Sequence, residues 1–228
     1  MTTNREHNMQ TTRVLTDSGR VLETNKVLRN TYALLSMTLL FSAITAGVAA
    51  TLNLPHPGIV ITLVGYFGLL FLTTKFRNSS TGLLCVFALT GFMGYTLGPI
   101  INAYLSMNNG PQLVATAMGA TGAIFLGLSG YALTSKKDFS FMGGFLMVGI
   151  LVAFLAGLGA IFFEIPALSL AVSAMFVLLM SGLILYQTSD IIRGRETNYI
   201  MATVTLYVAI FNLFTSLLHL LGFMNGDE

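Results

Sequence analysis

The chain has 228 residues, of which 54% are hydrophobic and only 9% are charged, and its formal net charge is +2. Soluble domains average about 25% charged residues. The chain therefore lacks the polar surface that a soluble enzyme or a nucleic-acid-binding domain of this size requires. A membrane-spanning helix takes roughly 20 apolar residues, so we expect an all-α membrane protein with about seven transmembrane helices, surrounded by lipid.

The first 30 residues are polar and rich in Thr, Asn and Arg. A cleavable secretory signal needs an early apolar stretch of about 7 to 15 residues, whereas no apolar run begins here before Thr31. We expect residues 1–30 to remain as a cytoplasmic polar tail, either a mobile tether or a handle for a cytoplasmic partner. Residues 31–228 are expected to form the transmembrane bundle.

Islands of charge and clusters of Pro and Gly divide the rest of the chain into apolar segments. We place the predicted spans at residues 31–52, 58–74, 82–105, 112–134, 140–163, 167–186 and 200–223. Every second loop contains Lys or Arg. These loops hold Lys75 with Arg77, Lys136 with Lys137, and Arg193 with Arg195. Positive loops stay in the cytoplasm, so the alternation predicts a cytoplasmic N-terminus and a C-terminus on the opposite side.

Small residues recur at four-residue spacing within the apolar segments. The rows are Gly94 with Gly98, the trio of Gly149, Ala153 and Gly157, and Ala43 with Gly47. In lipid, such rows let two helix backbones approach closely. We expect them to pack helices within one bundle, the alternative being contact between two copies of the chain.

Polar side chains in the last apolar segment share one face of the predicted helix. They are Thr205, Asn212, Ser216 and His219. A polar group in hydrocarbon is costly unless it faces a partner or water, so this face should point inward. It either hydrogen-bonds to neighbouring helices or lines a wet path, in which His219 would respond to pH near neutrality.

The end of the sixth segment adds Gln187 and Asp190, three residues apart on one helix face. Asp190 is expected either to pair with Arg193 at the inner membrane surface or to belong to a gate on the cytoplasmic side. The candidate gate or polar path thus comprises Gln187, Asp190, Arg193, Asn212, Ser216 and His219. The predicted spans contain no Asp or Glu, which argues against a proton-coupled transporter.

The sequence has no motif for catalysis or for phosphate binding. Its three histidines fall in different compartments of the predicted topology, so no two of them can share a metal ion. We therefore expect a protein that is not an enzyme and that has no metal and no cofactor.

Four sequence runs carry a resemblance to a known family. They are GYTLGPI at 94–100, KKDFSF at 136–141, YQTSDI at 186–191 and ETNYIMATVTLYVAIFNLF at 196–214. In this order and spacing they resemble the Bax inhibitor-1 family of seven-span membrane proteins, closest to its bacterial YccA-like branch. The resemblance covers nearly the whole chain.

The resemblance implies a bundle in which six helices surround a central C-terminal helix, and it implies two functions. In the YccA-like branch, the protein lies in the bacterial inner membrane. There the membrane-anchored AAA protease FtsH engages the protein at the protein's cytoplasmic N-terminal tail, and the protein restrains the activity of FtsH. In other branches the protein is a pH-sensitive leak for calcium or other cations, gated by two aspartates on the last two spans near a basic residue.

The matching positions in this sequence favour the first function. The two aspartates correspond to Gln187 and Ala209, and the basic residue falls between Lys75 and Arg77. A glutamine and an alanine cannot titrate as a coupled acid pair, and Asp190 alone makes a weak calcium site, because calcium takes about six to eight oxygen ligands. We therefore expect a modulator of FtsH, as its inhibitor or its substrate, with a cation leak as the alternative.

Overall fold

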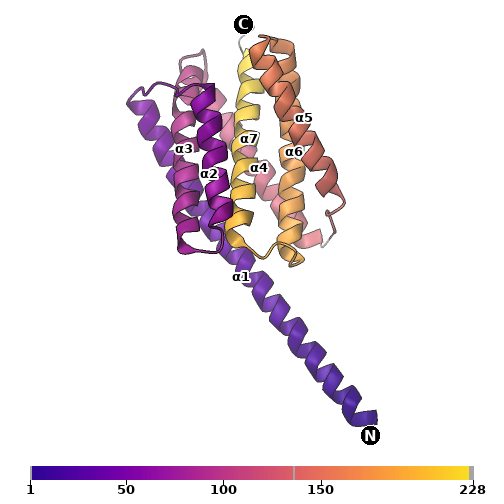
Figure 1. Cartoon of the computed structure of the whole chain (residues 1–228). Coiled ribbons are helices and arrows are strands. Elements are labelled where there is room, and N and C mark those ends of the chain that lie inside the picture. The colour runs from indigo at the N-terminus through magenta and orange to yellow at the C-terminus, as the bar shows by residue number, and fades with distance from the viewer. Residues whose placement is uncertain (1, 136, 226–228) are drawn as a thin grey trace.

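The computed structural model describes residues 2–135 and 137–225, except for the side chains of residues 2–21. Lys136 and residues 226–228 of the predicted bundle therefore lie outside the described residues. Within that part the chain forms seven helices and no strand (Figure 1). The helices are α1 (Thr2–Thr51), α2 (Ile59–Lys75), α3 (Ser80–Leu105), α4 (Gly110–Ser135), α5 (Met142–Phe162), α6 (Pro166–Ile192) and α7 (Tyr199–Asn225). The all-α prediction is confirmed.

Each predicted span corresponds to one of these helices. Six have the length and apolar composition of a membrane span, α1 contributing Leu22–Thr51. The remaining helix, α2, has 17 residues, which is the lower end of the spanning range of about 17 to 25 residues. It runs beside α3 (Figure 1). The chain is a multi-pass helical membrane protein.

The predicted boundary at residue 30 is not a break in the backbone. Helix α1 is continuous from Thr2 to Thr51, and its N-terminal part projects beyond the bundle (Figure 1). The first 30 residues contain no proline and a single glycine, Gly19, so nothing in them terminates a helix. The polar segment is a helical extension of the first span. Helix α6 also exceeds its predicted end at residue 186 and continues to Ile192.

Helix α7 occupies the centre of the bundle. Helices α1, α3, α4 and α6 pack directly against it, while α2 packs on α3 and α5 packs on α6. Of the six long spans, α7 has the largest buried fraction. The central C-terminal helix is thus confirmed, with four helices against it and two on the outside.

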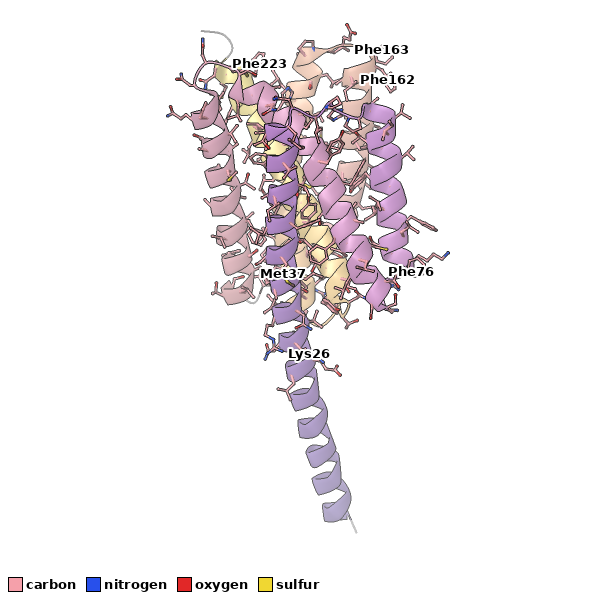
Figure 2. The ribbon with its side chains drawn as sticks, turned by 90° about the vertical axis from the view of Figure 1, so that its left-hand side faces the viewer. Lys26, Met37, Phe76, Phe162, Phe163 and Phe223 are labelled. Atoms are coloured by element: carbon pink, nitrogen blue, oxygen red, sulfur yellow. The ribbon has the colours of Figure 1, made fainter. Side chains whose placement is uncertain are left out.

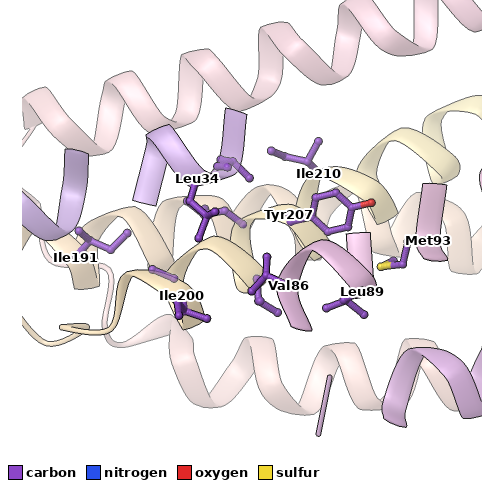
Figure 3. Packing of buried hydrophobic residues seen from close by; sticks show 12 residues of the cluster. Leu34, Val86, Leu89, Met93, Ile191, Ile200, Tyr207 and Ile210 are labelled. Carbon is purple, nitrogen blue, oxygen red and sulfur yellow. The ribbon is translucent and has the colours of Figure 1, made fainter. Parts of the chain in front are cut away.

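The largest hydrophobic cluster joins α7 to α1, α3 and the end of α6 (Figure 3). Its largest fully buried side chain is that of Tyr207, which is 1% exposed. The Tyr207 hydroxyl donates to the carbonyl oxygen of Thr90 at 3.2 Å and lies 2.6 Å from Ser42 Oγ, which donates to it. A buried hydroxyl needs such partners, so these bonds tie α7 to both α1 and α3 at membrane depth.

Two glycines bring α1 and α3 together. A Cβ atom at Gly94 would collide with Ser42 and Thr45, and one at Gly98 would collide with Ala46 and Ala49. Only a residue without a side chain fits where two backbones are this close. The expected role of this row, packing within one bundle, is confirmed.

The other two rows of small residues differ in outcome. On α5, Ala153 is fully buried and a Cβ at Gly149 would meet Leu179 of α6, so this row also packs two helices of the bundle. On α1, Ala43 and Gly47 are exposed, and a Cβ at Gly47 would meet no atom within 4 Å. The prediction for this last row was wrong, because spacing alone does not tell which face of a helix is covered.

The loops sort to the two ends of the bundle as the charge alternation predicted. At one end, which we call the basic end, Asn198 of the α6–α7 loop donates from Nδ2 to the carbonyl oxygen of Arg77 in the α2–α3 loop, at 3.0 Å. At the other end, Asn102 donates to the carbonyl oxygen of Ala50 at 2.7 Å. Figure 2 shows Lys26 at the basic end and Phe162, Phe163 and Phe223 at the opposite end.

Candidate functional site

Two of the recognised sequence runs meet at the basic end. Ser189, near the end of α6, accepts a hydrogen bond at Oγ from the backbone N–H of Phe139, at 3.3 Å, and donates to the carbonyl oxygen of Lys137, at 3.4 Å. Ser189 is 1% exposed. The α4–α5 loop is therefore fastened to the end of α6 by a buried hydroxyl.

A group of four charged side chains, which we call the loop cluster, surrounds this contact. Its members are Asp138, Asp190, Arg193 and Arg195. Arg195 donates from Nη2 to Asp138 Oδ1 at 2.5 Å and from Nε to Asp190 Oδ1 at 2.9 Å. Arg193 Nε lies 3.7 Å from Asp138 Oδ1. One guanidinium thus bridges a carboxylate of the α4–α5 loop and a carboxylate at the end of α6.

Two members of the loop cluster, Asp138 and Arg195, stay charged over the physiological pH range. The hydrogen bond from Arg195 and the backbone N–H of Ser140 hold the pKa of the Asp138 carboxyl well below its usual range. The same contacts, first with Asp138 and then with Asp190, raise the pKa of the Arg195 guanidinium. Because Asp138 and Arg195 are exposed, they contribute little to overall stability. They fix the relative positions of the two loops.

The structure changes the predicted partner of Asp190. A pair with Arg193 was one of the two roles expected of Asp190, but Asp190, whose side chain is 13% exposed, pairs with Arg195. Helix α6 ends at Ile192, and Gly194 adopts a φ of 67°, a left-handed conformation that glycine readily adopts. The chain therefore turns back, and the backbone N–H of Arg195 donates to the Asp190 carbonyl oxygen at 2.9 Å.

Asn198 is a residue of the basic end that our sequence analysis missed. Its Oδ1 accepts hydrogen bonds from the backbone N–H groups of Ile200, at 3.0 Å, and Met201, at 3.1 Å, as an N-cap residue does. Its amide nitrogen bonds to the α2–α3 loop. An Asn directly before a long apolar run is a helix-start signal, so this role was readable in the sequence.

The two candidate basic partners do not reach the gate residues through any hydrogen bond or ion pair within the described part of the chain. Lys75 and Arg77 are both exposed. The Lys75 ammonium lies 5.7 Å from the ring centre of Phe76, and Arg77 contributes its backbone carbonyl to Asn198.

The positions that correspond to the family's two aspartates are buried and uncharged. Gln187 on α6 is 5% exposed, and Ala209 on α7 is fully buried. The Gln187 amide nitrogen has no hydrogen-bond partner among the described residues. A neutral amide and a methyl group carry no proton that titrates near neutrality, so this pair cannot sense pH.

The polar face of α7 does not gather into one site. Asn212 donates to its own helix, from Nδ2 to the Val208 carbonyl oxygen at 2.8 Å. His219 Nδ1 lies 2.7 Å from Ser173 Oγ of α6, towards the end opposite the basic end. Ser216 is buried between these two levels. Across the described residues, no three His, Cys, Asp or Glu side chains group to hold a metal ion.

Comparisons with known proteins agree with the motif resemblance. The family described as "Inhibitor of apoptosis-promoting Bax1" matches residues 24–226. The "Modulator of FtsH protease YccA" of Escherichia coli (strain K12) is 54% identical over 211 residues, which is 92% of this chain and 96% of that protein. An uncharacterised protein of Pseudomonas aeruginosa is 53% identical over 90% of this chain and 93% of its own length. An uncharacterised protein of Neisseria meningitidis serogroup A is 32% identical over 92% of this chain and 96% of its own length.

Proposed function

The chain belongs to the Bax inhibitor-1 family, and from that premise we propose that it modulates an FtsH-type protease in the bacterial inner membrane. The observation that carries this proposal is the 54% identity to the Escherichia coli modulator across 96% of that protein. The chain acts by binding, as an inhibitor or a poorly degraded substrate, and not as an enzyme.

The packing of the bundle supports a role as a slowly degraded substrate. A protease that pulls on the chain must separate α7 from α1, α3, α4 and α6. It must also break the buried hydrogen bonds of Tyr207 with Ser42 and Thr90, and buried polar groups that lose their partners are costly. A bundle of this kind resists extraction while the protease remains engaged.

The placement of charge supports engagement from the cytoplasm. The loops with Lys and Arg, and the part of α1 that projects from the bundle, share the basic end (Figures 1 and 2). By the positive-inside rule the basic end faces the cytoplasm. The N-terminal extension then reaches the cytoplasm and the C-terminal end of α7 reaches the periplasm.

Photo-crosslinking in cells that contain Escherichia coli FtsH tests this proposal. A photoreactive amino acid replaces Lys26 at the basic end or, as the matched control, Phe223 at the opposite end; both side chains are exposed. We expect an adduct with FtsH from position 26 and a weaker one, or none, from position 223. The absence of an FtsH adduct at position 26, in protein that is inserted and folded, would overturn cytoplasmic engagement.

A further inference from the structure

A cavity of about 580 Å³ lies in the side of the bundle. Its floor is the middle of α7, including Val208, Phe211 and Asn212, and its walls come from α2 and α3 on one side and α5 and α6 on the other. Figure 1 shows α7 between these two pairs of helices. The volume lies within the range of about 300 to 1,000 Å³ that is typical of ligand pockets.

The surface of this lateral cavity is hydrocarbon-like. Three of its polar side chains already donate a hydrogen bond to a backbone carbonyl oxygen of their own helix or of the residue that precedes it. These are Thr62 to Gly58, Thr96 to Met93 and Asn212 to Val208, each at 2.8 Å. A bound water needs about two to four polar partners, and a cation needs several oxygen ligands. The lining favours an apolar occupant over water or an ion.

The cavity is continuous with the lipid-facing surface of the protein. The outer helices α2 and α5 meet across it through Phe67 and Phe154, whose ring centres are 5.8 Å apart. Beside them, Val64 of α2 is 68% exposed and Met147 of α5 is 77% exposed. In a chain that spans the membrane, such apolar side chains face acyl chains.

We propose that the lateral cavity binds one acyl chain of a membrane phospholipid. An empty apolar space would forfeit the dispersion contacts of every side chain that lines it, and phospholipid is the hydrocarbon present at this depth. The bound chain completes the packing of α2 against α5 and α6. It also covers Asn212, which is thereby part of a lipid site and not of an ion path. This inference does not depend on the protease.

Tryptophan fluorescence can test the occupant, because the chain contains no Trp. Phe154→Trp places a reporter in the lateral cavity, and Phe145→Trp places a control on the same helix, at a lipid-facing position that is 70% exposed and outside the lining. Each purified variant in detergent micelles is titrated with phospholipid brominated in its acyl chains. The cavity reporter should be quenched saturably at a low ratio of lipid to protein, and the control only in proportion to the lipid in the micelle.

A blocking substitution makes the test specific. Val208→Phe adds a ring to the cavity floor, whereas Val148→Phe adds the same ring at an exposed position of α5 outside the lining. In protein that also carries Phe154→Trp, Val208→Phe should weaken the lipid affinity measured by the saturable quenching by about tenfold or more. Val148→Phe should leave that affinity unchanged.

Three outcomes would overturn the proposal. They are quenching that rises equally at both reporters, quenching of the cavity reporter by aqueous iodide, and saturable quenching that Val208→Phe leaves intact. If Phe154→Trp does not fold, Phe176→Trp on α6, in the same wall of the cavity, serves as the reporter. Native mass spectrometry of the unaltered protein gives a second readout, since a retained phospholipid is expected and protein without lipid would contradict the site.

Discussion

Arg195 donates a hydrogen bond to Asp138 at 2.5 Å and thereby joins two loops whose residues are 57 positions apart in the chain. The same guanidinium holds Asp190 at the end of α6, directly after Ser189, which fastens the α4–α5 loop. Two of the four recognised sequence runs, at 136–141 and 186–191, therefore assemble around one side chain. Their common role at the basic end is to hold the loops in a fixed relation to α6 and α7.

Replacement of Arg195 should release the α4–α5 loop. In Arg195→Ala, Asp138 and Asp190 lose their shared partner, and we expect faster hydrogen exchange in residues 137–141 with little change in the cores of the helices. Arg77→Ala is the matched control, because the role of Arg77 at the basic end is carried by its backbone carbonyl. Equal exchange in the two variants would show that the bridge does not hold the loop.

The Asp138 bridge also predicts a dependence on pH. Its carboxyl has a pKa below the ordinary value of about 3.9, so the stabilisation is fully present above that value and is lost as the pH falls through the lowered pKa. Protection of the loop, corrected for intrinsic exchange, should be constant between about pH 5 and 8 and fall below about pH 4. Asp138→Asn should remove the acid-dependent loss. A transition near neutrality would contradict this assignment.

The close packing of α1 on α3 gives a prediction about stability. In Gly94→Leu, the added side chain meets Ser42 and Thr45, and overpacking of this kind costs about 1 to 3 kcal/mol. In the control Gly127→Leu, a Cβ would meet no atom within 4 Å, so unfolding should be unaffected. Thermal unfolding in detergent compares the two, and equal midpoints would refute the close contact.

His219 serves in this account as a structural tie between α6 and α7. Its hydrogen bond with Ser173 should contribute about 1 kcal/mol. His219→Ala and Ser173→Ala should then destabilise the bundle by similar amounts, and the double variant by no more than either alone. Additive effects would mean that the two side chains do not act together.

A flux measurement distinguishes a structural role of His219 from a role as a pH sensor. Calcium and proton flux from liposomes that contain the protein, measured from about pH 6 to 8 around the ordinary His pKa, should not exceed the flux from empty liposomes. Pronounced release that His219→Ala abolishes would instead favour the cation leak of the other family branches.

The N-terminal extension should set the lifetime of the protein in cells. Deletion of residues 2–20 removes part of α1 that projects from the bundle, and we expect a longer half-life, because the protease loses its point of engagement. A replacement helix of equal length and unrelated polar sequence is the control. An unchanged half-life after deletion would remove the extension from the mechanism.

Much of the fold follows from the sequence, because in lipid each span must be a helix and positive loops must share a side. The row of Gly94 and Gly98 was predictable for the same reason. The bridge from Arg195 to Asp138 was not, since it joins two loops and depends on the turn at Gly194. Tyr207 also escaped notice, because a tyrosine in an apolar run resembles its neighbours until its hydroxyl partners are known.

Reconstitution of the protease with the protein tests the central claim most directly. Escherichia coli FtsH is placed in proteoliposomes with a membrane-protein substrate, and the rate of substrate degradation is measured as this chain is added. Our account predicts that the rate falls as the amount of the chain rises, and that the variant lacking residues 2–20 lowers it less. A rate unchanged by a large molar excess of the folded chain would contradict the account.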